Sequence, residues 1–466
     1  MNKFLLFLSI TFLFSCGENQ KNSPYIYFAG EIVNPKNDSV ILYKDDRKVC
    51  SSKLDSNNRF AFELDSSAEE GLYHFGHEEV QYIYLEKGDS LLIRVNTVDF
   101  DESLVFDGKG QEINNFLLEM FLTHEDEELN IVEKMYFLNP NEFSKKVDSL
   151  HDKKIDLLNT LKTEASLTDN AVRIAKTGID YTTYLYKEKY PFKHRRAVKE
   201  KALMQPPEGF YNYRKELTYN NPNYTYITPY YNFMKQHFGG MSYINCKEGC
   251  EVNGSFYINQ LHFNEHQLTL IDSMVGEKNL KDNLIRNVAL NYLLRSDDTY
   301  ENNTIFMKDL HKVASNNKHI GEIDSLYKSI KNLQPNLVLP KIYIHNVDGE
   351  KKSLEDISKA HKNVVFYFWM GENNVHFRHI TNRVNQLKEN PNNKYTYIGI
   401  SLRTDEKNWK DIVKSNNLDQ KTQYRAEDLK KLNNILIING KLNRAVITDN
   451  GKIIDGFANI YGNYDK

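Results

Sequence analysis

An apolar run that leads into a polar loop decides the fold of this chain: Phe366-Tyr367-Phe368-Trp369-Met370-Gly371-Glu372-Asn373-Asn374-Val375-His376-Phe377-Arg378. The segment from Asn363 to Trp369 is almost continuously apolar, which is typical of a strand buried on both faces in the middle of a parallel sheet. The residues from Val375 to Leu387 have helical periodicity. We therefore predict a central strand, a short loop and a helix that begins at this loop.

Strands and helices alternate on both sides of this segment. The expected elements are a strand at 338–344, a capped helical turn at 353–357, a strand at 395–402 and helices at 406–413 and 426–436, followed by a hairpin at 444–454. The hairpin carries Asp449-Asn450-Gly451, a strong turn signal. This order predicts a three-layer α/β/α domain over residues 335–466.

Two other patterns precede this domain. Residues 25–108 contain short alternating segments divided by turn formers, which favours an antiparallel β-sandwich. Residues 109–333 have apolar side chains at spacings of three and four, which predicts a helical domain. The expected fold class is a multidomain α+β protein.

Tyr, Phe and Asn are concentrated between Phe210 and Phe263. Aromatic side chains mixed with Asn can line a peptide or glycan groove, but they more often pack helices together. We favour helix packing here and keep a groove as the alternative.

The first 24 residues predict export and a lipid anchor. After a short basic start, the apolar run Phe4 to Phe14 is too short to span a bilayer. The following Leu13-Phe14-Ser15-Cys16-Gly17 resembles a bacterial lipobox, which implies a signal peptide at 1–15, lipidation of Cys16 and a tether at 16–24. An ordinary signal peptide with a chance cysteine is the alternative. We expect a lipid-anchored membrane protein of the cell envelope that faces the periplasm.

The charge balance and the motif content exclude several classes of function. Sixty Lys and Arg residues against 63 Asp and Glu residues give a net charge of -3, so no nucleic acid partner is expected. The chain has no Gly-rich phosphate loop, no His-Glu-x-x-His and no Gly-x-Ser-x-Gly. We expect no cofactor.

Residues 335–466 resemble the thioredoxin-like domain of the TlpA/ResA family of exported thiol-disulfide proteins in Gram-negative bacteria. The resemblance rests on the order of Leu339-Pro340, Asp348-Gly349-Glu350-Lys351 with Ser353-Leu354, Phe368-Trp369 and Asp449-Asn450-Gly451. It implies a thioredoxin-like fold, and the preceding residues resemble the N-terminal extension of such lipoproteins.

The chain departs from the family at the redox site. Asn373 and His376 stand where the family carries the two cysteines of its Cys-x-x-Cys motif, and Leu442 and Asn443 occupy the family's cis-Pro loop without a proline. Only a thiolate attacks a disulfide, and a cis peptide bond is costly without proline. The resemblance therefore implies a degenerate site without catalytic residues, with a trans peptide in the loop.

Metal binding at this site is not expected. His376 and His379 lie one turn apart on one helix face, and the helix dipole favours the neutral imidazole of His376. Two ligands are too few for a zinc site, however, and no third is placed beside them by the sequence.

Three thiols remain besides Cys16. We expect Cys50, in an alternating strand, to act as a small buried apolar residue. Cys246 and Cys250 are spaced to close a small disulfide loop or to form a redox pair, and we favour the structural disulfide.

The predicted function is non-catalytic binding of a periplasmic protein or peptide by a lipoprotein with a thioredoxin-like domain. The alternative is a thiol-disulfide oxidoreductase that uses Cys246 and Cys250 or a dithiol of its partner. A structural envelope lipoprotein without a specific ligand is a third class.

Overall fold

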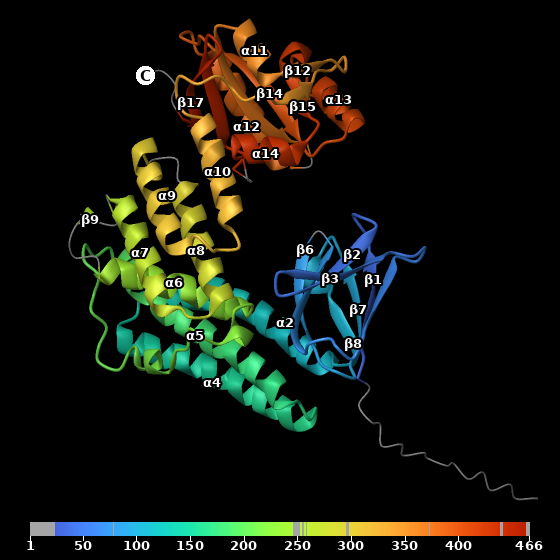
Figure 1. Cartoon of the computed structure of the whole chain (residues 1–466), viewed down its shortest axis with the longest axis vertical. Helices are drawn as coiled ribbons and strands as arrows, with labels where there is room; N and C mark the ends of the chain where they lie inside the picture. Colours follow the sequence, from blue (N-terminus) through green and yellow to red (C-terminus); the bar gives the residue numbers. More distant parts are fainter. Residues whose placement is uncertain are drawn as a thin grey trace, which may run out of the picture. The chain divides into compact units, whose positions relative to one another are not determined.

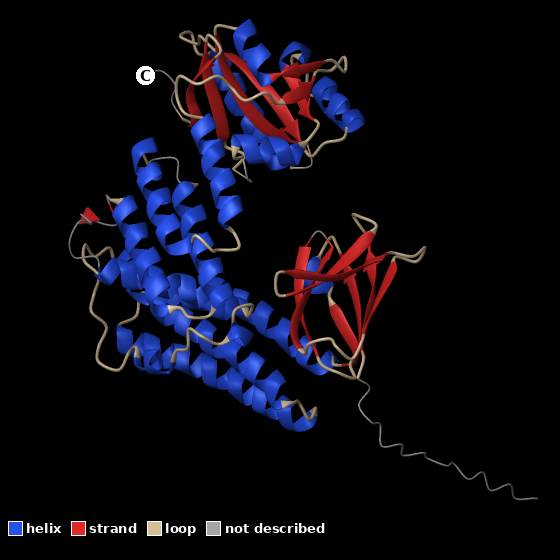
Figure 2. Ribbon diagram, viewed as in Figure 1, coloured by secondary structure: helices blue, strands red, loops and turns tan. Residues whose placement is uncertain are grey.

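Sheets at both ends of the chain and helices between them make up the computed structural model (Figures 1 and 2). The structure describes residues 24–77, 79–245, 252–253, 256–257, 259–294, 298–371, 373–438 and 441–462. The chain divides into two compact units, Met1–Gly240 and Met241–Lys466. The predicted lipidation of Cys16 and the predicted disulfide between Cys246 and Cys250 lie outside the described residues.

The first unit begins with a β-sandwich of two four-stranded sheets, ordered β4-β1-β7-β8 and β3-β2-β5-β6. Their bounds are β1 Ile26–Val33, β2 Ser39–Lys44, β3 Arg47–Lys53, β4 Arg59–Leu64, β5 Gly71–His77, β6 Glu79–Leu85, β7 Ser90–Asn96 and β8 Val105–Lys109, with the short helix α1 Phe100–Ser103 before β8. The predicted sandwich is confirmed, with one difference. Strands β1 and β7 pair in parallel, whereas we expected only antiparallel pairs.

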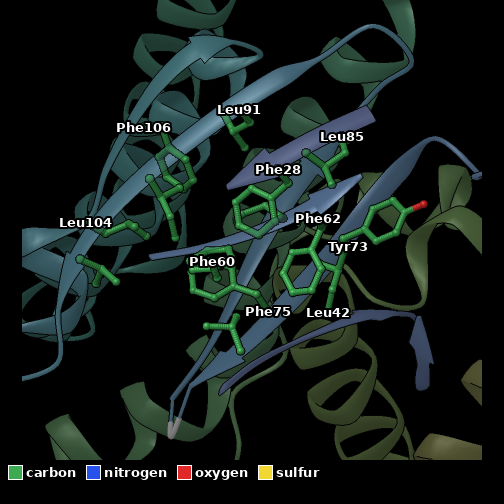
Figure 3. Packing of buried hydrophobic residues seen from close by; sticks show 14 of the residues in the cluster. Phe28, Leu42, Phe60, Phe62, Tyr73, Phe75, Leu85, Leu91, Leu104 and Phe106 are labelled. Carbon is green, nitrogen blue, oxygen red and sulfur yellow. The ribbon is translucent and has the colours of Figure 1, made fainter. Parts of the chain in front are cut away.

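Residues that alternate into the space between the two sheets form a single apolar core (Figure 3). Phe28 lies at its centre, with its ring centroid 5.4 Å from that of Phe60 and 5.5 Å from that of Phe75. Cys50 packs against this core but is only partly buried, whereas we expected it to be buried.

Helices follow the sandwich in the first unit. They are α2 Gln111–Asp126, the π-helical turn η1 Glu127–Val132, α3 Glu133–Met135, α4 Pro140–Glu164, α5 Asp169–Val198, the 3-10 turns η2 Asn212–Glu216 and η3 Pro222–Tyr224, and α6 Thr228–Asn245, which continues into the second unit. Side chains cap the starts of α4, α5 and η3: Asn139 accepts from Glu142 N and Thr168 from Ala171 N, both at 3.1 Å, and Asn221 accepts from Asn223 N at 3.0 Å. Such caps satisfy N–H groups that have no partner within the helix.

Polar side chains join the helices of this unit. Glu188 of α5 is buried, and its carboxylate accepts hydrogen bonds from Tyr213 at 2.9 Å, from Arg214 at 2.8 and 2.6 Å and from His237 at 3.0 Å. The second ring nitrogen of His237 lies 3.0 Å from the hydroxyl of Tyr219. The network therefore ties η2 and the loop after it to α5 and α6.

The aromatic residues after Phe210 mostly pack between these helices. Tyr213, Tyr230, Phe233 and Phe238 are buried, and the ring of Tyr213 stacks on Tyr184 with a centroid distance of 4.4 Å. Helix packing, the favoured interpretation, is confirmed for these residues. Part of the aromatic stretch lies outside the described residues.

The second unit begins with more helices. It contains the short strands β9 Val252–Asn253 and β10 Phe256–Tyr257, and the helices α7 Gln260–Met274, α8 Lys278–Leu293, α9 Tyr300–Ala314 and α10 Ile320–Asn332. Within the described residues, no helix of either unit combines the length and the hydropathy needed to cross a bilayer.

A seven-stranded mixed sheet, ordered β12-β11-β15-β14-β13-β16-β17, forms the rest of the second unit (Figure 2). Its elements are β11 Tyr343–His345, β12 Lys351–Ser353, α11 Leu354–Ala360, β13 Asn363–Met370, α12 Asn374–Glu389, β14 Thr396–Leu402, α13 Glu406–Ser415, the 3-10 turn η4 Gln420–Thr422, β15 Gln423–Ala426, α14 Leu429–Leu436, β16 Arg444–Asp449 and β17 Lys452–Asn459.

Strand β13 lies inside the sheet, as predicted, but it pairs in parallel only with β14 and antiparallel with β16, so the sheet is mixed where we expected a parallel one. Its residues Val365, Tyr367 and Trp369 belong to one core with residues of α12 and α13. The alternate residues, including Phe366 and Phe368, are buried as well. Because successive side chains of a strand point to opposite faces, both faces of the sheet are covered.

Two expected elements have different bounds. The strand predicted at 338–344 is shorter and shifted, since β11 begins at Tyr343 and Val338 makes only an isolated bridge to Lys452. The helix predicted from Ala426 begins at Leu429, because Gln423–Ala426 pairs with β14 as the unpredicted strand β15. Asp428 caps the helix through Lys431 N at 2.8 Å. Periodicity alone does not separate a short strand from the first turn of a helix.

Candidate functional site

The segment between β13 and α12 makes a tight turn that leaves no room for a side chain at Gly371. A Cβ atom there would meet Cδ1 of Ile412 at 2.5 Å and Oγ1 of Thr404 at 3.2 Å. The same Thr404 hydroxyl accepts a hydrogen bond from Gly371 N at 3.3 Å. This packing carries the chain from the end of β13 to the start of α12.

Asn373 caps helix α12. Its side-chain Oδ1 accepts a hydrogen bond from His376 N at 2.9 Å, and its carbonyl accepts from Phe377 N, also at 2.9 Å. The first turn of a helix leaves backbone N–H groups without a partner inside the helix. The chain itself supplies an acceptor for one of them, and this acceptor is neutral.

His376 lies in the first turn of α12 with its ring partly buried. Both ring nitrogens are shielded from solvent, and neither has a hydrogen-bond partner of ordinary geometry. Burial lowers the pKa of His376; the neighbouring main chain of Leu442 acts in the opposite direction, and His379 adds to the lowering. The imidazole is therefore neutral at pH 7.

Leu442 and Asn443 lie in the loop before β16, and the main chain of Leu442 is close to the ring of His376. All peptide bonds of the described residues are trans, including those of this loop, as expected without a proline. The carbonyl of Asn443 accepts from Ile460 N at 2.8 Å, and Arg383 of α12 donates to the carbonyls of Ile460 at 3.2 Å and Gly462 at 2.7 Å. The loop and the helix are thus held by the same C-terminal segment.

Arg444 supports the other end of this loop. Its guanidinium is buried, donates to the carbonyl of Ile437 at 2.8 Å and lies 4.9 Å from the ring centroid of Phe457. Ile437 ends α14 with φ +54° and ψ +44°. A β-branched residue rarely adopts this left-handed conformation, which costs about 1–2 kcal/mol and persists only where the surroundings hold it.

A buried polar network lies behind the turn. Trp369 Nε1 donates to Oε1 of Gln423 at 3.1 Å, and Nε2 of Gln423 donates to the hydroxyl of Tyr367 at 3.0 Å. These bonds satisfy three polar groups inside the sheet and fix the indole that precedes the turn.

Of the four residues that the sequence singled out in this domain, Asn373 contacts the backbone of His376, and Leu442 lies near the ring of His376. Asn443 follows Leu442 in the loop and bonds to Ile460. The roles of Arg444, Ile437 and Gln423 were not predicted. An arginine at the start of the otherwise apolar strand Arg444-Ala445-Val446-Ile447 was the one sequence signal available for them. Within the described residues, no group of three or more His, Cys, Asp or Glu side chains is placed to hold a metal ion.

Comparison with known proteins finds likeness in structure only. No family model and no curated protein matches the sequence. The thioredoxin domain of a thiol-disulfide oxidoreductase from Bacteroides vulgatus is 18% identical over 28% of this chain and 94% of that chain, with a TM-score of 0.23. A thiol:disulfide interchange protein from Bacteroides sp. is 20% identical over 27% of this chain and 81% of that chain, with a TM-score of 0.21.

A longer match extends to a thioredoxin-like protein from Bacteroides caccae, with 11% identity over 43% of this chain and 74% of that chain and a TM-score of 0.30. Identities at this level concern the fold and not the activity. The C-terminal sheet of this chain is a mixed α/β sheet in which helix α12 follows strand β13. The chain has N-terminal β sheets, a helical middle region and a C-terminal mixed α/β sheet, the part for which the sequence predicts a thioredoxin-like fold.

Proposed function

We propose that this protein is a periplasm-facing lipoprotein, anchored through Cys16, whose thioredoxin-like domain binds a protein or peptide without exchanging disulfides. One observation carries the proposal: residues 335–466 contain no cysteine, although the strand, the turn and the helix of the site are all formed. Because disulfide exchange requires a thiolate, this domain has no nucleophile of its own for that reaction.

The residues at the site support binding. We call five residues together the α12 surface: Asn373, Val375, His376, Leu442 and Asn443. Val375 is 56% exposed, although it is apolar, and Leu442 is partly exposed. Two apolar side chains beside a neutral imidazole suit contact with an uncharged peptide segment.

The structure around the α12 surface also favours binding, because its conformation is held in advance. The Asn373 cap fixes the start of the helix, and Arg444 and Ile460 hold the two ends of the loop. A surface that is already ordered loses less entropy when a ligand binds.

Insulin-disulfide reduction tests the absence of redox activity. We expect the purified mature protein to reduce insulin no faster than buffer with dithiothreitol alone. Activity that disappears in the Cys246→Ser variant would instead support the alternative, an oxidoreductase that uses Cys246 and Cys250.

An array of overlapping, cysteine-free peptides from unfolded exported proteins tests binding. We expect a subset of the peptides to bind, and Val375→Asp to weaken them by about tenfold or more, because the charge replaces an apolar contact. Ile454→Asp is the matched control, since Ile454 is 51% exposed on β17 of the same domain and does not belong to the α12 surface. Equal loss in both variants, or binding unaffected by Val375→Asp, would contradict the proposal.

A further inference from the structure

The outer face of the sheet β4-β1-β7-β8 contains an open depression with a volume of about 530 Å³. Residues of β1, β4 and β7 line it, together with the end of β3. This volume lies within the range of about 300–1,000 Å³ that is usual for small-molecule sites. The depression is in the first unit, far in sequence from the thioredoxin-like domain.

The strand register places a row of charges across one end of the depression. Glu31 of β1 lies opposite Arg59 of β4 on one side and opposite Arg94 of β7 on the other. The three side chains point to the outer face, because the residues next to them along each strand point into the sandwich core.

The two guanidinium groups share one carboxylate. Nε of Arg59 lies 3.7 Å from Glu31, and Nε of Arg94 lies 3.6 Å from it, both longer than a hydrogen bond. Both arginine side chains are about two-thirds exposed, at 64% and 65%. Lys53 also lines the depression, so the lining carries the basic side chains of Arg59, Arg94 and Lys53 against the carboxylates of Glu31 and Asp55.

Asp55, the other acidic residue of the lining, is already engaged. Its carboxylate accepts hydrogen bonds from Asn57 N at 2.8 Å and Arg59 N at 2.9 Å, which lower its pKa. These bonds hold the β3–β4 turn, and the lowered pKa keeps the carboxylate of Asp55 charged at pH 7. Three basic and two acidic side chains still give the lining one net positive charge, and the exposed arginine side chains can reach an anion.

The floor of the depression is flat and apolar. The next row across the sheet consists of Ala61, Ala29 and Leu92, of which Leu92 is 40% exposed. Tyr27 borders this floor at the end away from the arginines. The depression exists because the side chains of two alanines in adjacent strands are small. The ring of Tyr27 and the side chain of Leu92 offer apolar surface beside it.

We propose that this depression binds an acidic saccharide, a sugar ring that carries a carboxylate. The carboxylate pairs with Arg59 and Arg94, whose planar guanidinium groups match carboxylate geometry. The C–H face of the ring lies on Ala61, Leu92 and Tyr27. An extended peptide would have to pair with the edge strand β4, since β1 is hydrogen-bonded on both edges. On β4, Ser52 Oγ already accepts a hydrogen bond from Ala61 N at 3.4 Å.

Titration calorimetry on the purified mature chain tests the proposal, with tetragalacturonate as the probe and a neutral glucose tetrasaccharide for comparison. We expect binding of the acidic probe only. Arg59→Gln and Arg94→Gln should each weaken it by about tenfold or more, because each removes a charge-assisted contact. Ala61→Leu, which fills the floor at an exposed position of β4, should also weaken it.

Arg47→Gln is the matched control, since Arg47 is exposed on β3 outside the depression and has only long ion pairs, at 3.8 and 3.9 Å. Equal thermal unfolding of all variants shows that they are folded. No binding at millimolar probe, equal binding of the neutral sugar, or binding unchanged by both arginine variants would overturn the proposal. Tighter binding of an oligoglutamate peptide at the same arginines would overturn it in favour of an acidic-peptide site.

Discussion

The side chain of Asn373 and the backbone N–H of His376 form a 2.9 Å hydrogen bond that closes the start of helix α12. The resemblance noted in the sequence predicts that the thiol-disulfide proteins of that family carry a cysteine at each of these two positions. Here the first position supplies a neutral acceptor to the helix, and the second supplies a partly buried, neutral imidazole. In this chain the two positions therefore bond to the helix itself or hold a neutral ring, and their chemistry differs from that of a dithiol.

Removal of this cap is expected to destabilise the second unit. Asn373→Ala should cost about 1 kcal/mol, because one backbone N–H loses its acceptor. Asn373→Asp keeps the acceptor and places a negative charge at the positive end of the helix dipole, so it should be at least as stable as wild type. Urea unfolding measures the differences, with Asn374→Ala at the next, exposed position as the control. An aspartate variant less stable than the alanine variant would contradict the capping role.

His376 is expected to titrate below its ordinary value of about 6.5. Burial lowers its pKa, so the folded form takes up its proton at lower pH than the unfolded chain does. Linkage gives the sign of the effect on the free energy of unfolding. Above pH 6.5 the residue costs no stability, and as the pH falls through its folded pKa it reduces stability, because the unfolded chain binds the proton more readily. Following the imidazole C–H resonances by NMR checks this, with His376→Gln to assign the signal. A midpoint above 6.5 would show that the ring is charged at the site.

Glu188 is expected to be the most sensitive polar position of the first unit. Glu188→Gln leaves Arg214 without its counter-charge. Breaking such a pair should cost about 3 kcal/mol of stability. This is the low end of the usual range, because Arg214 is partly exposed. Thermal unfolding at pH 7 measures the loss. Lys162→Gln removes an exposed ion pair of the same unit and should change stability by less than about 1 kcal/mol.

The cost of Glu188→Gln should also depend on pH. Burial by itself raises the pKa of Glu188, but hydrogen bonds and charges from His237 and Arg214 outweigh it and the pKa is lowered. A lowered carboxyl pKa contributes stability above the unfolded value, near 4.5, that is lost as the pH falls through the folded value. The difference between wild type and variant should therefore shrink below pH 4.5. A constant difference down to pH 3 would contradict this account.

Two glycines should respond in opposite ways to alanine. Gly451 has φ +78° in the turn between β16 and β17, and a Cβ there would meet Lys359 at 2.8 Å, so Gly451→Ala should destabilise by about 1–2 kcal/mol. Gly178 lies inside α5 with nothing within 4 Å of an added Cβ, so Gly178→Ala should stabilise by about 0.5–1 kcal/mol. Thermal unfolding of both variants measures the signs. The same sign for both would show that the backbone conformation does not control these positions.

Much of the thioredoxin-like domain could be predicted because its signals are local. The apolar run of β13, the capped start of α11 at Ser353 and the Asn450-Gly451 turn each depend on a few neighbouring residues. The strand β15 was missed because its pairing with β14 is a contact between distant segments. The parallel pairing of β1 with β7 was missed for the same reason.

The sequence by itself determined the succession of sheet, helices and thioredoxin-like sheet, and it determined that residues 335–466 have no thiol. Both follow from local periodicity and residue identity. Only the tertiary structure decided that Asn373 caps the helix facing the loop of Leu442, that Arg444 holds Ile437 in a left-handed conformation, and that Arg59 and Arg94 flank one glutamate. These relationships join segments that are separate in the chain, and side-chain geometry across such distances is set by packing, which local pattern does not encode.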